Sequence, residues 1–285
     1  MGRNKKGFVY LLLPVLALII VGVFGVVFFL NRDTSTNLTS SLQSKLGGGP
    51  QAGEGALSFW KQDENGWRTI GEPPACPNPL ELPSPVDLSK ATSVLYPGQM
   101  RSVGYENTAG FRFDGERNEA IVVTAPMDGE VIQAARFIAG GDIQYVFDIL
   151  SSCGIMTRFD HLLRLTPKFQ EIADGLPEPK ENDSRSTFIN PPVKVSSGEV
   201  IATAVGIASG GHPQFGGVNT FVAWTVFDFR AKNKASLDSS WASEHPTLDH
   251  YVVCPYDYLS SQDQELVKGL PASDSMSGTK SDFCE

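Results

Sequence analysis

The stretch that decides the fold runs from Gly129 to Leu150 and reads GEVIQAARFIAGGDIQYVFDIL. It holds two β-rich runs, Gly129 to Phe137 and Ile143 to Leu150, with a pair of glycines between them. Runs of β-branched and aromatic residues that are bounded by glycine and aspartate are typical of short strands. The stretch therefore predicts two strands of a domain that is built mainly from β-sheet.

The same pattern recurs on both sides of this stretch. Further β-rich runs, separated by Gly, Pro and Asp, lie at Ala120 to Ala125, Ile155 to Asp160, Val193 to Val195, Glu199 to Val205 and Phe221 to Phe229. Helical spacing of apolar residues is weak in this part of the chain. Short helices are expected only after His161, around Pro167 to Ala173 and around Ser261 to Lys268. An antiparallel sheet protein fits this pattern best.

A long apolar segment, Phe8 to Leu30, stands near the N-terminus and contains no charged side chain. As a helix that rises about 1.5 Å per residue it covers on the order of 35 Å, enough for a hydrocarbon core of about 30 Å. A cleaved signal peptide is the alternative, but its apolar core is shorter and small residues follow it, whereas this run ends in VVFFLNRD. The basic residues Arg3, Lys5 and Lys6 predict a single-pass protein of the cell membrane, with a cytoplasmic N-terminus and an extracytoplasmic C-terminal domain.

Composition divides the chain into five parts. Residues 1–7 are expected to form a basic cytoplasmic segment and residues 8–30 the transmembrane helix. Residues 31–94 are expected to be a flexible stalk that ends in a Pro-rich approach, because the start of this segment is polar and has little to bury. Residues 95–259 form the predicted β domain, which has an ordinary length for one domain. Residues 260–285 are a polar tail whose end Cys284 can tie down.

The chain is acidic, with a formal net charge of −9. The part that is expected outside the cell is more acidic still, since three basic residues precede the apolar segment. Nucleic acid and anionic lipid head groups both attract clustered Lys and Arg, and the sequence contains no basic run. Composition therefore argues against nucleic acid as a partner, and the expected contact with the membrane is the single N-terminal helix.

The four cysteines, Cys76, Cys153, Cys254 and Cys284, are scattered over the part that follows the apolar segment. None lies in a C-x-x-C or other metal-ligand spacing, so disulfides are the natural interpretation for a protein in an oxidising compartment. Four cysteines allow three complete pairings, and the sequence does not choose among them. Because Cys76 and Cys254 flank the predicted core, a bond between these two is the first expectation.

Four blocks, in order, resemble the LytM and lysostaphin family of zinc endopeptidases, which cut bacterial peptidoglycan. Thr108 to Val131 begins with TAGFR, where such domains have H-x-G-x-D, and continues to the turn APMDGEV. Arg158 to Leu163 (RFDHLL) resembles Y-x-H-L-S, and Val195 to Gly206 (VSSGEVIATAVG) resembles V-K-K-G-Q-V-I-G-x-V-G. Trp224 to Arg230 (WTVFDFR) resembles H-L-H-F-E-V-R. The resemblance spans about residues 107–230 and implies a LytM-like antiparallel β sandwich built on a duplicated hybrid motif.

The residues that hold zinc in active members of this family are not retained. On this alignment the ligand positions are Thr108, Arg112 and Val226, a further catalytic histidine is replaced by Trp224, and only His161 remains. Zinc catalysis needs three converging His, Cys, Asp or Glu donors and an open position for water. A hydroxyl, a guanidinium and an isopropyl group do not supply them. The resemblance therefore implies a pseudoenzyme that needs no cofactor and keeps His161 as a catalytic remnant, with zinc only if other ligands have taken over.

A remnant groove is the candidate binding site. Its candidate residues are Arg112, Arg158, Asp160, His161, His212 and Trp224. Strand alternation places Arg158 and Asp160 on one face and Phe159 on the other. Such a groove could bind a carboxylate, a peptide or a sugar, although an internal ion pair would explain the same residues. A rebuilt metal site would draw on side chains whose spacing is not diagnostic, namely Asp114, Asp160, His161 and His212.

Three functions remain open. The first is a non-catalytic LytM-like domain, presented on a membrane-anchored stalk, that binds a cell-envelope polymer, a glycan or a protein partner. The second is an active zinc-dependent cell-wall endopeptidase with rearranged ligands. The third is a purely structural surface protein. The sequence lacks G-x-S-x-G, H-E-x-x-H, P-loop and dinucleotide-binding patterns, so it favours no other enzyme class.

Overall fold

The structure is a computed structural model that describes residues 55–101, 104–209, 219–273 and 281–284. The predicted basic segment, the predicted transmembrane helix over residues 8–30, the first part of the predicted stalk and His212 all lie outside these residues. Within the described ranges, no helix combines the length and the apolar character that a membrane span requires.

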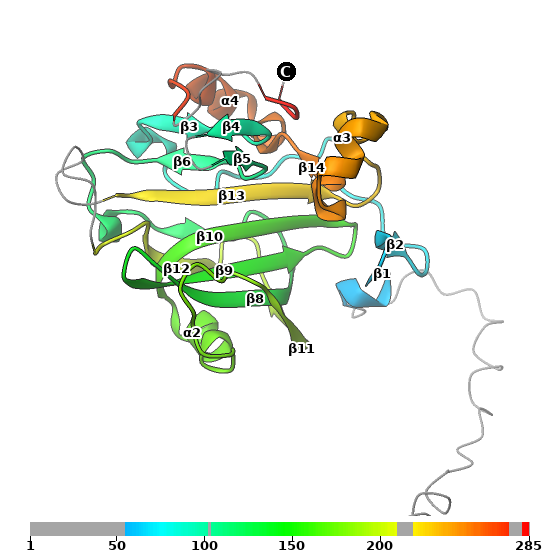
Figure 1. Cartoon of the computed structure of the whole chain (residues 1–285), viewed down its shortest axis with the longest axis horizontal. Helices are drawn as coiled ribbons and strands as arrows, with labels where there is room; N and C mark the ends of the chain where they lie inside the picture. Colours follow the sequence, from blue (N-terminus) through cyan, green and yellow to red (C-terminus); the bar gives the residue numbers. More distant parts are fainter. Residues whose placement is uncertain (1–54, 102–103, 210–218, 274–280, 285) are drawn as a thin grey trace, which may run out of the picture. The chain divides into compact units, whose positions relative to one another are not determined.

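The described chain is mainly β, and all pairings between its named strands are antiparallel (Figure 1). The central sheet follows the order β11 (Thr187–Val195), β8 (Gly129–Ala139), β9 (Asp142–Leu150), β10 (Ile155–Leu165), β13 (Phe221–Asp228), β6 (Gly110–Arg112) and β3 (Ser93–Leu95). Three shorter partners complete it: β12 (Val200–Val205) pairs with β10 and β7 (Val123–Thr124), and β14 (Val252–Val253) pairs with β13.

Two further hairpins, three helices and several short 3₁₀ turns lie outside the central sheet in the described ranges. The hairpins are β1–β2 (Trp60–Asp63, Gly66–Thr69) and β4–β5 (Gln99–Arg101, Gly104–Glu106), and the helices are α2 (Pro167–Asp174), α3 (Ser239–Glu244) and α4 (Ser261–Lys268). The 3₁₀ turns are η1 (Ala56–Ser58), η2 (Leu88–Lys90), η3 (Asn118–Ala120), η5 (Ala235–Leu237), η6 (Thr247–Tyr251) and η7 (Pro255–Tyr258).

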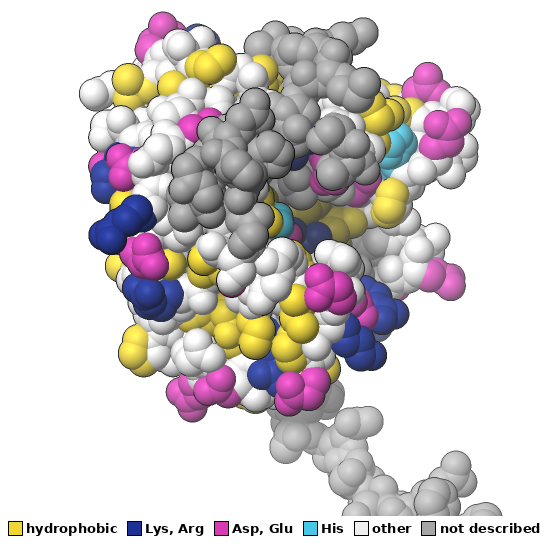
Figure 2. Space-filling view, turned by 60° about the vertical axis from the view of Figure 1, so that its left-hand side comes forward, with side chains coloured by type: hydrophobic (Ala, Val, Ile, Leu, Met, Phe, Trp, Pro, Cys, Tyr) yellow, Lys and Arg dark blue, Asp and Glu magenta, His cyan; other side chains and the backbone are white. Residues whose placement is uncertain are grey.

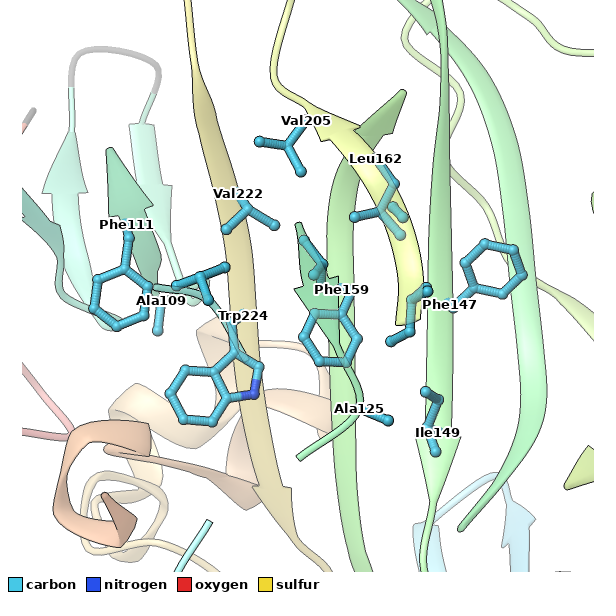
Figure 3. Close-up of a cluster of buried hydrophobic side chains, with 14 of the residues drawn as sticks. Ala109, Phe111, Ala125, Phe147, Ile149, Phe159, Leu162, Val205, Val222 and Trp224 are labelled. Carbon is cyan, nitrogen blue, oxygen red and sulfur yellow. The ribbon is translucent and has the colours of Figure 1, made fainter. Parts of the chain in front are cut away.

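The main hydrophobic core lies against one face of the central sheet. Phe111 of β6, Trp224 of β13 and Phe159 of β10 point into it from neighbouring strands (Figure 3), and none of the three side chains is exposed. Burying each such side chain contributes about 1.5–3 kcal/mol. Gly110 lets β6 approach β13 closely, because a Cβ atom there would lie 2.1 Å from the carbonyl oxygen of Val222.

Most predicted strands and helices are confirmed. The runs at residues 129–137, 143–150, 155–160, 193–195, 199–205 and 221–229 form β8, β9, β10, β11, β12 and β13, and the helices at residues 167–173 and 261–268 are α2 and α4. Of the strand expected over residues 120–125 only β7 forms, and its first residue, Ala120, belongs to η3. The helix expected after His161 is wrong. There β10 continues to Leu165, because Leu162 still pairs with Tyr145 of β9 and Val205 of β12.

The folded domain begins before the predicted boundary at residue 95. Trp60, Trp67 and Leu82 fall in the region that was expected to be stalk and approach, yet each is at most 4% exposed. The ring of Trp67 stacks on Phe229 at 4.8 Å between centroids. A few large apolar side chains are thus enough to pack this part of the predicted stalk and approach onto the domain, although the segment is polar overall. The predicted tail likewise contains buried Val267.

The described residues contain two disulfides, Cys76–Cys153 and Cys254–Cys284. The expected Cys76–Cys254 bond is wrong. Cys153 lies in the turn between β9 and β10, which the N-terminal part of the domain crosses: the indole Nε1 of Trp60 donates to the carbonyl of Ser152 at 2.9 Å. Position along the chain therefore did not indicate which segments meet. Two disulfides are typical of proteins outside the reducing cytoplasm.

Candidate binding site

The second face of the central sheet, opposite the main core, carries polar side chains in its middle. Arg158 of β10 stands directly between Asp148 of β9 and Thr225 of β13 in the strand register, so these three side chains share a face. We call this surface the polar floor. Its members are Gln144, Asp148, Arg158, Asp160, His161 and Thr225. Beyond one edge of it, Ile132, Leu150, Met156 and Phe227 form a second hydrophobic cluster with the β1–β2 hairpin.

The centre of the polar floor is a buried ion pair. Asp148 is fully buried and accepts two hydrogen bonds from Arg158, from Nε and Nη2, each at 2.7 Å. Burial by itself would lower the pKa of Arg158, but the carboxylates of Asp148, Asp160 and Asp249 outweigh it and raise that pKa. Arg158 is therefore a permanent cation, and 24% of its side chain is exposed. The predicted sharing of one face by Arg158 and Asp160, with Phe159 opposite, is confirmed.

His161 sits at a break in the pairing between β9 and β10, and its backbone is left-handed, with φ +62°. Residues other than glycine rarely adopt this conformation, which costs of order 1–3 kcal/mol and persists where the surroundings enforce it. The carboxylate of Asp160 accepts from the His161 backbone N–H. The ring lies 4.4 Å from the ring of Phe221. The histidine is thus held by its backbone and by its neighbours.

The tautomer of His161 follows from Gln144. The amide nitrogen of Gln144 donates to the carbonyl of Ala139 at 3.2 Å, so its oxygen is the atom that meets Nδ1 of His161. An amide oxygen only accepts, and therefore Nδ1 carries the hydrogen. In the neutral imidazole the lone pair is then on Nε2, which makes Nε2 a hydrogen-bond acceptor.

A wall beside the polar floor is built around Asp249 of η6. Its carboxylate accepts from the side-chain amide of Asn107, which follows β5, and lies 3.8 Å from Nδ1 of His245, which follows α3. Asp249 is only 4% exposed, and burial raises its pKa above the ordinary aspartate value, against the opposing effects of Asn107, the nearby histidines and Arg158. We call Asn107, His245 and Asp249 the acidic wall.

The structure brings some of the predicted site residues together and separates others. Arg112 bonds Asp114 at 2.9 Å and Asn219 at 3.0 Å, and its guanidinium lies 5.9 Å from the ring of Phe221, which His161 also contacts. Thr108 is bonded to Arg101, which donates to its hydroxyl and carbonyl oxygens.

Val226 and Trp224 point away from the polar floor into the main core, and neither is exposed. The alignment had placed them with Thr108 and Arg112. In the structure Ala223 and Thr225 occupy the face that Arg112 shares, since Arg112 pairs with Phe221 and alternate residues of β13 follow it. A shift of one residue in a strand moves every side chain to the other face. The proposed convergence of Thr108, Arg112, His161 and Val226 is therefore wrong.

No cluster of three His, Cys, Asp or Glu side chains suited to a metal ion occurs in the described parts of the chain. Asp114 is bonded to Arg112, and Asp160 to the backbone of His161. Of the alternative metal set, Asp114, Asp160 and His161 form no such cluster, and His212 lies outside the described residues. The positions that the structure places beside Gly110 on this face hold Ala223 and Thr225, and neither residue is a zinc donor.

Sequence reasoning missed Gln144, Asp148, Asn107 and Asp249. The strand IQYVFDIL did carry a signal, because Gln144 and Asp148 lie an even number of residues apart and so share one face. Figure 2 shows a hollow near the middle of one side of the molecule, with a histidine and a basic side chain inside it. Comparison with protein-family models, curated proteins and solved structures finds no match for this chain.

Proposed function

We propose that this chain is a membrane-anchored, extracytoplasmic binding module of LytM-like type, which holds a cell-envelope polymer, a glycan or a protein partner on its polar floor. Two parts of this proposal rest on the sequence: the four ordered blocks support the duplicated hybrid motif, and the apolar segment Phe8 to Leu30 supports the membrane anchor. The two disulfides support a location outside the cytoplasm.

The observation that carries the proposal is the fixed geometry of His161. The backbone of His161 is left-handed although the residue is not glycine, its ring packs on Phe221, and Gln144 sets its tautomer. Together these features fix the position of one hydrogen-bond acceptor, Nε2. Such strain clusters at ligand-binding and catalytic sites, where it preorganises a side chain. Arg158, whose side chain is 24% exposed, adds a guanidinium donor, and Asp160 adds acceptor oxygens. Hydroxyl and amide groups, which abound in glycans and peptides, fit this set.

Binding is favoured over hydrolysis by the identity of the neighbouring side chains. Around Gly110 the sheet face offers Ala223, Thr225 and the Arg112 guanidinium. An activated water in a zinc hydrolase needs three anionic or imidazole donors around one point. A guanidinium paired with Asp114 brings positive charge instead. The alternative, a zinc-dependent cell-wall endopeptidase with rearranged ligands, would need donors from outside the described residues.

The test is binding of soluble peptidoglycan fragments to the full-length protein in detergent, by calorimetry. His161→Asn keeps a residue that tolerates the left-handed backbone but removes the imidazole acceptor. We expect roughly tenfold weaker binding, since a hydrogen bond contributes about 0.5–1.5 kcal/mol and about 1.4 kcal/mol is tenfold. Arg185→Ala, at a side chain that is 84% exposed and forms a salt bridge to Asp183, is the control. Stoichiometric zinc together with fragment cleavage that is lost in His161→Asn would overturn the proposal.

A further inference from the structure

The last described segment, Ser281 to Cys284, is fastened to the domain at several points. Its disulfide joins Cys284 to Cys254, directly before η7. The backbone N–H of Asp282 donates to the carbonyl of Gly98 at 3.0 Å, and the hydroxyl of Ser281 donates to the carbonyl of Pro97. The ring of Phe283 lies edge-on to Trp241, with centroids 5.9 Å apart.

Asp282 joins two elements that are far apart in the sequence. One carboxylate oxygen, Oδ2, accepts from the hydroxyl of Tyr105 in β5 at 2.8 Å and from the indole Nε1 of Trp241 in α3 at 3.0 Å. Burial and the neighbouring Asp282 both raise the pKa of Tyr105, so its hydroxyl stays protonated and remains a donor. The segment therefore ties β5 to α3 through a single side chain.

Those two elements lead directly into two of the three residues of the acidic wall. Asn107 follows β5 and His245 follows α3, and both contact Asp249. The ring of His245 stacks on Trp241 at 4.0 Å and contacts Tyr105 at 4.4 Å between centroids. A continuous set of contacts thus leads from the Cys254–Cys284 bond through Asp282 to the wall beside Arg158.

A cavity of about 440 Å³ opens beside this disulfide. Both of its cysteines line the cavity, together with Lys232, Tyr258 and Phe283 among others. The two disulfides also constrain different amounts of the structure. Cys76–Cys153 spans 77 residues and joins the N-terminal part of the domain to the β9–β10 turn, whereas Cys254–Cys284 spans 30 and holds the short last segment.

We propose that the Cys254–Cys284 disulfide is a redox latch: a dithiol reductant opens it, the segment Ser281 to Cys284 leaves its seat, and the acidic wall loosens. One thiolate of the reductant attacks a sulfur of the bond, and the other cysteine leaves as a thiolate and takes up a proton. The second thiol of the reductant then attacks the mixed disulfide. The reductant ends as a disulfide, and Cys254 and Cys284 end as thiols. The regulatory part, control of ligand binding, rests on the proposed function.

The test titrates the full-length protein in detergent with dithiothreitol, traps thiols by alkylation and identifies them by mass spectrometry. Cys254 and Cys284 should be half reduced at a dithiothreitol concentration at least tenfold below that for Cys76 and Cys153. Amide hydrogen exchange should then rise over residues 104–107 and 239–245 and stay unchanged over β8 and β9. Equal reduction of both bonds, or unchanged exchange once Cys254–Cys284 is open, would overturn the latch.

Two variants separate the latch from general loosening. Asp282→Ala should reproduce the faster exchange in β5 and α3 while the disulfide stays closed, and Glu265→Ala, at a 74% exposed side chain on α4, should not. Peptidoglycan fragments are titrated in the same samples, where opening the latch should weaken binding about tenfold. If the oxidised protein binds no fragment, the proposed function fails while the exchange data still decide the latch. If binding occurs and reduction leaves it unchanged, the regulatory part of the latch is refuted.

Discussion

Replacing Arg158 by methionine tests the ion pair at the centre of the polar floor. The variant keeps most of the aliphatic length but leaves the Asp148 carboxylate, which is fully buried, without its two hydrogen bonds. Removing one partner of a buried pair costs about 3–5 kcal/mol. Because the side chain of Arg158 is 24% exposed and water can reach the site, we expect the lower end, about 3 kcal/mol.

The assay is urea unfolding at pH 7 together with a thermal melt of the full-length protein. A loss of about 3 kcal/mol lowers the melting temperature by roughly 6–12 °C for a domain of this size. The double variant Arg158→Met/Asp148→Leu removes both charges and should be less destabilised than Arg158→Met alone, because no buried charge is left unpaired. A cost below about 1 kcal/mol for Arg158→Met, or a double variant that is worse than the single one, would refute this reasoning.

Three further predictions concern the core and the acidic wall. Phe159→Ala should cost about 3–5 kcal/mol in urea unfolding, since it empties a fully buried site that Trp224 lines from the next strand; a cost below about 1 kcal/mol would contradict that packing. Gly110→Ala should abolish folding or cost about 3 kcal/mol or more, measured by circular dichroism, because its Cβ would lie 2.1 Å from a backbone oxygen; wild-type stability would mean that β6 does not approach β13 so closely. Burial raises the pKa of Asp249 in the folded protein. The stability that its protonated carboxyl contributes is therefore fully present at pH values below the ordinary aspartate pKa, and it is lost as the pH rises through the pKa of the folded protein. Asp249→Asn should therefore be more stable than the wild type at neutral pH in urea titrations, with a difference that shrinks toward about pH 3, and a constant difference would count against it.

Local pattern was enough for much of the fold. The existence of β8, β9, β10 and β13 can be read from their β-rich runs, and in β10 the alternation of faces can be read as well, because side chains in a strand point to opposite faces in turn. The same rule placed Arg158 and Asp160 together and Phe159 opposite, as the structure has them. The start of α2 at Pro167 and the Ser260 cap of α4 are likewise local signals.

Long-range pairing was not accessible from local pattern. The partner of Arg158 is Asp148 on a neighbouring strand, and the partner of Cys153 is Cys76, which is 77 residues away. The assignment of Val226 to the groove failed because a one-residue shift is invisible in a strand that is apolar on both faces. The left-handed backbone of His161 arises at a break in the pairing of β9 and β10, and the position of that break depends on the partner strand rather than on the residues around His161.

The most direct test of the central claim is the state of one atom, Nε2 of His161. The full-length protein, labelled with ¹⁵N-histidine, is observed by NMR in detergent before and after addition of peptidoglycan fragments. We predict that the His161 ring carries its hydrogen on Nδ1, that its Nε2 resonance moves as fragments bind, and that the resonances of buried His250 do not. A hydrogen on Nε2 in the free protein, or a His161 signal that stays unchanged at saturating fragment, would contradict the account.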